Sequence, residues 1–192
     1  MSTHLARAQM LIERSRYEQA IGELQRHLAD DPNNPLVHAQ LALCLSELKK
    51  HQEATEAAGR AVHLAPDLAF SHYVLAETYY ARNRLPQALS AANESIRLDP
   101  EDADHWGLLA RIHFASSRWR PALEAVEKGL EIDPENVACA NLRAMCLVKL
   151  GRRGEAGATI DTALARDPEN ALSHANQGWT LLEQRRPQQA ME

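Results

Sequence analysis

Apolar residues recur along this chain at the spacing of an amphipathic helix, and the helical segments come in pairs. The apolar positions of one such pair are Leu75 and Tyr79, followed by Leu89, Ala92 and Ile96. Intervals of three and four residues correspond to about one turn of an α-helix, so each set lines one helix face. The pattern predicts a first helix at residues 70–82 and a second at residues 86–98.

Proline marks the period of this pattern. Five prolines are each separated by 34 residues: Pro32, Pro66, Pro100, Pro134 and Pro168. A frame that places them at position 32 needs no insertion and gives five full repeats with a partial sixth. These repeats are residues 1–34, 35–68, 69–102, 103–136, 137–170 and the partial 171–192. We interpret residues 1–192 as a single array of repeats.

Two columns of this frame hold small residues. Position 20 is Ala20, Ala54, Ala88, Ala122, Ala156 and Ala190, and position 8 is Ala8, Ala42, Ala76, Ala110, Ala144 and Gly178. Two helices packed as a tight hairpin need small side chains where their backbones approach, and each column supplies them from one helix. We therefore expect a first helix at about positions 2–14 of each repeat and a second at about positions 18–30.

Residues that begin and end helices agree with this frame. Asn34, Asp102 and Asn136 occupy the last position of their repeats, and such residues cap helix N-termini. Asn83 and Gly151 stand where a first helix must end, because both residue types adopt the left-handed conformation of helix C-termini. The punctuation thus predicts hairpins throughout the chain.

The period, the small residues at positions 8 and 20 and the proline at position 32 resemble the tetratricopeptide repeat family. The segments LDPED at residues 98–102 and IDPEN at residues 132–136 resemble it too, and the resemblance covers the whole chain. It implies an all-α, right-handed α-solenoid of stacked antiparallel helical hairpins. The aromatic residue usual at position 4 appears only as Trp106. The other repeats have His4, His38, His72, Ala140 and His174 there.

The resemblance also implies a function, because in this family the first helices line a concave groove that receives a peptide or a partner helix. The groove positions are 2, 5, 9 and 12, which include Ala39 and Asn141. The residues that we expect to contact a ligand are Leu36, Leu43, Phe70, Tyr73, Glu77, Tyr80, Arg111 and Phe114. Two roles stay open for Tyr80 and Phe114, ligand contact or packing on the next repeat. Glu77 and Arg111 share a column in adjacent repeats, so they are also candidates for an ion pair.

Composition and charge exclude several other classes. The formal net charge of −5 argues against non-specific binding of nucleic acid, which requires a basic surface. No apolar run is long enough to span a membrane or to serve as a secretion signal. Cys44, Cys139 and Cys146 do not form a disulfide pattern, which favours a reducing, cytoplasmic compartment.

Neither catalytic nor metal-binding motifs are found in the sequence. No phosphate loop, nucleophile elbow or HExxH motif occurs. The histidines at position 4 are too widely spaced to hold one metal ion. We therefore expect no catalysis, no metal and no cofactor, and we expect a protein-binding scaffold or adaptor.

A basic residue at position 16 of every repeat gives the predicted solenoid one basic edge. These residues are Arg16, Lys50, Arg84, Arg118, Arg152 and Arg186. Favourable electrostatics at helix C-termini explain such an edge. A docking surface for an acidic partner or an anionic lipid is the alternative.

The last repeat suggests two other functions. Residues 171–192 contain Trp179, Leu181 and Leu182 on a first helix whose partner helix has barely begun. This indicates a fragment of a longer protein, and an incomplete repeat is suited to end-to-end homodimers. The alternatives to a peptide-binding scaffold are therefore a self-assembly module, or the recognition domain of a larger enzyme or membrane-anchored protein.

Overall fold

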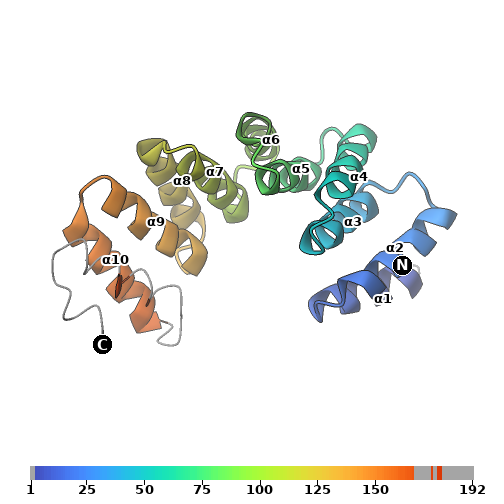
Figure 1. Ribbon diagram of the computed structural model, residues 1–192, viewed down its shortest axis with the longest axis horizontal. Coiled ribbons are helices and arrows are strands. Elements are labelled where there is room, and N and C mark those ends of the chain that lie inside the picture. Colours follow the sequence, from blue (N-terminus) through green and yellow to red (C-terminus); the bar gives the residue numbers. More distant parts are fainter. Residues whose placement is uncertain (1–2, 167–173, 175–176, 179–192) are drawn as a thin grey trace. The chain divides into compact units, whose positions relative to one another are not determined.

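The computed structural model describes residues 3–166 together with His174, Gln177 and Gly178, and the elements in this part of the chain are α-helices (Figure 1). The chain divides into two compact units, residues 1–100 and residues 101–192, which are called unit 1 and unit 2 below. The apolar residues predicted in the sixth repeat, Trp179, Leu181 and Leu182, lie outside the described residues.

Unit 1 consists of three helical hairpins. Its helices are α1 (Thr3–Glu13), α2 (Tyr17–Asp30), α3 (Pro35–Glu47), α4 (His51–Leu64), α5 (Ala69–Ala81) and α6 (Leu85–Leu98). Each odd-numbered helix packs against the helix that follows it. The bounds of α5 and α6 lie within one residue of those that the apolar pattern predicts.

Two hairpins form the described part of unit 2. Its helices are α7 (Ala103–Ala115), α8 (Trp119–Ile132), α9 (Val137–Lys149) and α10 (Arg153–Arg166). As in unit 1, each first helix packs against the second helix of its own hairpin. The hairpin therefore recurs with the 34-residue period of the sequence.

The predicted N-caps are confirmed at three first helices. The side chain of Asn34 accepts a hydrogen bond from the backbone N–H of Val37 at 3.3 Å, and Asn136 accepts one from Cys139 at 2.9 Å. Asp102 accepts from the N–H of Asp104 at 2.9 Å. Each bond satisfies a backbone donor that the first turn of a helix leaves without an intrahelical partner.

The first helices end in the same turn in all five described hairpins. Position 15 has a positive φ angle each time, at Ser15, Lys49, Asn83, Ser117 and Gly151. The N–H of the next residue reaches back to the carbonyl of position 11, as from Lys50 to Leu45 at 2.9 Å. This is the Schellman arrangement, which satisfies the last carbonyls of a helix. The helix ends predicted at Asn83 and Gly151 are thus confirmed.

The small-residue columns form the hairpin interiors as predicted. Ala20, Ala54, Ala88, Ala122 and Ala156 have no exposed surface, and Ala8, Ala42, Ala76 and Ala110 also have none. A larger side chain at either column would separate the paired helices, because protein interiors are close-packed.

Neighbouring hairpins within a unit contact each other in a regular way. Each second helix packs on the next first helix, α2 on α3 and α4 on α5 in unit 1, and α8 on α9 in unit 2. First helices also contact one another, α3 with α5 and α7 with α9. In unit 1 the residues of α3 and α5 therefore share one surface.

Candidate binding surface

Six of the predicted ligand-contacting residues lie on α3 and α5 of unit 1. They are Leu36 and Leu43 on α3, with Phe70, Tyr73, Glu77 and Tyr80 on α5. We call this set the first-helix surface. Their spacing by three, four or seven residues places the members from each helix on one helix face. Since α3 and α5 are in contact, the structure brings these six residues into one region.

The exposure of these side chains differs. Leu36 is 49% exposed, one of two large hydrophobic residues in the described part of the chain that are classed as exposed. The other five are partly buried. Leu43, Phe70 and Tyr73 pack against a core cluster that includes Ala39 and Ala42, so they contribute to the interior and to the surface.

Two aromatic rings and a carboxylate form the polar and aromatic part of the first-helix surface. The rings of Phe70 and Tyr73 are stacked, with centroids 6.4 Å apart and an interplanar angle of 18°. The Tyr73 hydroxyl donates to the Glu77 carboxylate at 3.5 Å. This arrangement offers flat apolar area next to a negative charge, a combination suited to binding a protein segment.

The remaining two predicted residues, Arg111 and Phe114, lie on α7 of unit 2. Arg111 is exposed. The ring of Phe114 contacts Trp119 of α8 edge to face, with centroids 4.9 Å apart and an angle of 62°. Phe114 therefore packs within its own hairpin, and the two roles left open for it, ligand contact and packing on the next repeat, stay predictions. The pairing of Glu77 with Arg111 stays a prediction.

Position 5 differs from the expectation in two repeats. Ala39 has no exposed surface and Asn141 is only 2% exposed. Both occupy position 5, which we expected to face a groove. A small residue at this position is covered by the neighbouring helices, whereas the longer Tyr73 reaches the surface.

Two of the histidines at position 4, on α3 and α5, have a role that the sequence did not reveal. The Nε2 atom of His38 lies 2.9 Å from the carbonyl oxygen of Pro32, and that of His72 lies 2.8 Å from the carbonyl of Pro66. Each ring thus donates a hydrogen bond to the turn before its own helix. Among the described residues, no group of three or more His, Cys, Asp or Glu side chains gathers where it could hold a metal ion.

The three cysteine thiols are free and buried. Burial raises the pKa of Cys44 and of Cys139 to about 11 and that of Cys146 to about 12. A thiol in that state forms little of the reactive thiolate near neutral pH.

Comparison with protein families identifies the class of this chain. A model described as tetratricopeptide repeat matches residues 11–69 and 47–112, and another of the same description matches residues 159–192. A model for subunit 3 of the anaphase-promoting complex, or cyclosome, matches residues 87–163. The chain belongs to the tetratricopeptide repeat family, whose fold generally mediates protein–protein interaction.

Solved structures share the same fold. TTC0263, a thermophilic tetratricopeptide protein of Thermus thermophilus, is 23% identical with a TM-score of 0.81, over 93% of this chain and 97% of that one. PilF of Pseudomonas aeruginosa is 20% identical with a TM-score of 0.84, over 98% and 86%. YrrB, a tetratricopeptide protein with an unusual peptide-binding site, is 18% identical with a TM-score of 0.68, over 88% and 87%.

No curated protein matches the chain. Within the described residues, no helix is both long enough and apolar enough to cross a membrane.

Proposed function

We propose that this chain is a protein-interaction scaffold that binds a peptide segment or a partner helix on the first-helix surface. The observation that carries the proposal is the set of large apolar side chains that stay partly exposed on two contacting helices. Leu36 projects beyond the core, and Phe70 and Tyr73 present stacked rings. YrrB supports the proposal as a protein of this fold that has a peptide-binding site.

The chemistry of this surface indicates the kind of segment that fits it. Leucine and aromatic side chains gain free energy when a partner removes them from water, at roughly 25 cal/mol per Å² of apolar area. Glu77 adds a carboxylate beside the Tyr73 hydroxyl. A segment with apolar side chains next to a lysine or arginine would complement both features.

Unit 2 has candidate residues of its own, Arg111 and Phe114 on α7. Arg111 is exposed, and its guanidinium suits an acidic residue of a ligand that binds on unit 2. Because the Phe114 ring packs on Trp119, we assign Phe114 a supporting role and Arg111 the direct contact.

A peptide selection on the intact chain tests this proposal. Peptides displayed on phage are selected on the wild-type chain, and the affinities of the enriched sequences are measured by fluorescence anisotropy. In the double variant Phe70→Ala, Tyr73→Ala we expect binding to weaken by tenfold or more, because aromatic residues at the centre of an interface dominate its energy. Leu36→Ala should weaken binding by a smaller factor.

The control is Gln87→Ala, a substitution at an exposed position on α6, which should leave the affinity unchanged. Circular dichroism and thermal unfolding of each variant show whether the helices persist. Equal affinity of the selected peptides for wild type and for a folded double variant would refute the first-helix surface as the binding site.

A further inference from the structure

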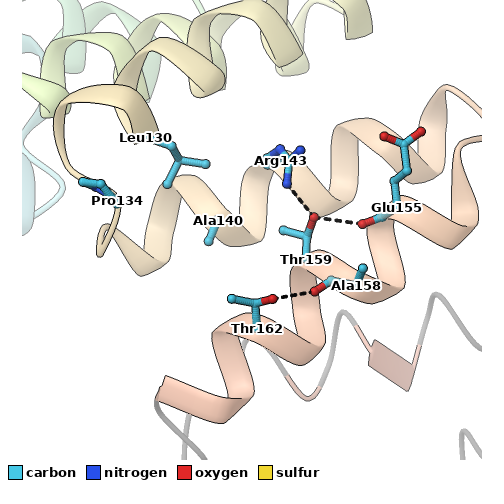
Figure 2. A pocket seen from close by; sticks show the side chains of 8 residues that line it. All are labelled: Leu130, Pro134, Ala140, Arg143, Glu155, Ala158, Thr159 and Thr162. Atoms are coloured by element: carbon cyan, nitrogen blue, oxygen red, sulfur yellow. Dashed lines mark hydrogen bonds between the residues drawn. The ribbon is translucent and has the colours of Figure 1, made fainter.

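A cavity of about 390 Å³ opens on the second-helix side of unit 2 (Figure 2). Leu130 of α8 and Ala140 of α9 supply apolar surface, and the polar groups come from Arg143 of α9 and from Glu155, Thr159 and Thr162 of α10. Sites for small ligands or single side chains commonly have volumes of roughly 300–1,000 Å³. The cavity is therefore large enough for a bulky side chain.

This cavity is separate from the face of α9 that was predicted to meet a ligand. Ala140 and Arg143 are three residues apart and lie on one side of the helix. Ala138 and Met145 are seven residues apart, and the helical repeat places them on the opposite side. The cavity is therefore independent of the first-helix surface and of the proposed function.

The two residues that α9 contributes both depart from the pattern of the repeats. Position 4 is Trp106 in the first helix of the preceding repeat, whereas Ala140 leaves only a methyl group there. Position 7 is a leucine in the second, third and fourth repeats, but it is Arg7 in the first and Arg143 in the fifth. The leucines are Leu41, Leu75 and Leu109. Both departures fall in one helix and meet at one cavity.

A third departure on α10 anchors the arginine. Position 23 is Ala57, Ala91 and Ala125 in the three preceding repeats, and here it is Thr159. Arg143 Nη1 donates to the Thr159 hydroxyl oxygen at 2.8 Å, and that hydroxyl donates to the carbonyl of Glu155 at 2.9 Å. Figure 2 shows the two side chains meeting between α9 and α10. The guanidinium is thus held in place while 31% of the side chain remains exposed.

These exchanges do not improve the packing of the repeat. Placing a charged group where the three preceding repeats have leucine costs desolvation free energy. Replacing an indole by a methyl group gives up apolar contacts. Sites at which a sequence breaks its own local rule are often functional.

We propose that this cavity receives an aromatic side chain, a tyrosine or tryptophan, from a segment of a partner protein. The fit rests on the volume of the cavity, on the apolar surface of Leu130, and on the guanidinium of Arg143. A cavity of about 440 Å³ in unit 1 is lined by largely the same repeat positions but has Leu75 in place of the arginine. A guanidinium beside the cavity complements the negative face of an aromatic ring. The protein would thus contact a partner on the second-helix side as well.

The charges around Arg143 favour a neutral ring over an anion. The carboxylate of Glu127 lies 3.7 Å from Arg143 Nε, and Glu155 forms two hydrogen bonds to Arg152 at 2.7 and 2.8 Å. An anionic ligand would approach these two carboxylates and be repelled, whereas a neutral aromatic ring retains the cation–π attraction.

The test uses N-acetyl-tryptophan amide as a neutral probe of the cavity in the intact chain. Methyl NMR should show ring-current shifts at Ala140, Thr159 and Thr162, with a dissociation constant on the order of 1 mM, as for a fragment. N-acetyl-leucine amide, a non-aromatic probe, should bind at least fivefold more weakly because it has no π system.

Two variants locate the site. Ala140→Trp fills the cavity with the residue found at position 4 of α7, so it should stay folded and abolish the ring-current shifts. Ala138→Trp makes the same exchange at an exposed position on the same helix and should leave them unchanged. The double variant Arg143→Leu, Thr159→Ala restores the pair of the preceding repeats, so it should fold normally and bind the tryptophan probe about five- to tenfold more weakly.

Three results would overturn the proposal. The first is an absence of shifts at the three cavity methyl groups in the wild-type chain at 10 mM probe, a concentration about ten times the expected constant. Unchanged binding to folded Ala140→Trp is the second. Equal affinity for the leucine and tryptophan probes is the third, since an apolar hollow without aromatic preference would explain it.

Discussion

The two units fill the same positions of the repeat with side chains of different size. At position 24 the second and third hairpins of unit 1 have Ala58 and Ala92, whereas the two hairpins of unit 2 have Val126 and Ile160. At position 10 the fully buried residue is Thr78 in α5 but Ile112 in α7. The core of unit 1 therefore depends largely on alanine, and that of unit 2 on branched aliphatic residues.

This difference determines which groups remain for binding. In unit 1, Phe70 and Tyr73 pack over a cluster rich in alanine and keep part of their rings exposed. In unit 2, large aliphatic side chains fill the interior, and the cavity on the second-helix side presents Arg143 where the equivalent cavity of unit 1 has Leu75. A repeat of constant backbone thus offers different surfaces according to where its bulky residues lie.

The largest effect that separates the two units should come from position 10. Ile112→Ala removes a large side chain with no exposed surface, so it should lower the free energy of unfolding of unit 2 by about 2–5 kcal/mol. Thr78→Ala removes only a methyl group and a hydroxyl that donates to the Leu75 carbonyl, and should cost about 1–2 kcal/mol. Chemical denaturation compares the two.

Thiol labelling assigns each loss to a unit. Cys44 lies in unit 1, while Cys139 and Cys146 lie in unit 2, and all three are buried. Because the raised pKa and the burial suppress labelling of the folded form, labelling reports local opening. Ile112→Ala should accelerate labelling of Cys146 more than that of Cys44. Equal acceleration of both would show that the two cores do not respond separately.

A larger side chain at position 24 should destabilise unit 1 more than unit 2, which is the reverse of the effect expected at position 10. Ala92→Leu inserts three carbon atoms where unit 1 is filled by alanine, and should cost about 1–3 kcal/mol through overpacking. Val126→Leu adds one carbon at the equivalent position of unit 2 and should cost less than about 1.5 kcal/mol. Thermal unfolding measures both variants. A smaller loss for Ala92→Leu than for Val126→Leu would contradict the contrast between the two cores.

The fold could be predicted from the sequence because the residues that define each hairpin recur at fixed positions of the repeat. Proline fixed the period, alanine at positions 8 and 20 identified the hairpin interior, and the caps at Asn34 and Asn136 identified helix starts. These features act on the backbone within a few residues, so their consequences are visible in a short stretch of sequence.

The candidate surface could be predicted only in part, because its details depend on contacts between helices. The columns of the repeat gave the helix face of Leu36 and Phe70, but not the burial of Asn141. The bond between Arg143 and Thr159 joins residues on different helices, and the unusual pair of residue types was the only signal for it. The joint replacement of leucine by Arg143 and of alanine by Thr159 in one repeat would have pointed to this bond at the cavity.

A smaller effect should come from the turn after each first helix, where Gly151 of unit 2 can be compared with Lys49 of unit 1. Gly151 of unit 2 has a φ of 78°, and nothing lies within 4 Å of an added Cβ, so Gly151→Ala tests the backbone alone. It should cost about 1 kcal/mol, because the left-handed region is unfavourable for a residue with a side chain. Lys49→Gly, at a φ of 61° in unit 1, should gain about 0.5–1 kcal/mol. Thermal unfolding of both variants measures the pair.

The smallest effect should be a dependence of the stability of unit 2 on pH, which arises at His113, position 11 of the fourth repeat. Burial, assisted by the nearby Arg118, lowers the pKa of His113, while Glu124 opposes the shift. The unfolded chain therefore binds a proton near the ordinary value of 6.5 before the folded chain does. At pH 8 the imidazole is neutral in both states and contributes nothing to the difference. As the pH falls through 6.5, protonation favours the unfolded state, so this residue destabilises unit 2 progressively.

The variant His113→Tyr sharpens the comparison, because the equivalent residue on α5 of unit 1 is Tyr79. It should reduce the loss of stability between pH 8 and pH 5, measured by urea denaturation at each pH. His63→Gln, at an exposed histidine on α4, is the control and should leave the profile of unit 2 unchanged. If the stability profiles of wild type and His113→Tyr coincide, folding does not favour the neutral form of His113 over its protonated form. The acid sensitivity of unit 2 would then have to arise from other titratable groups in that unit.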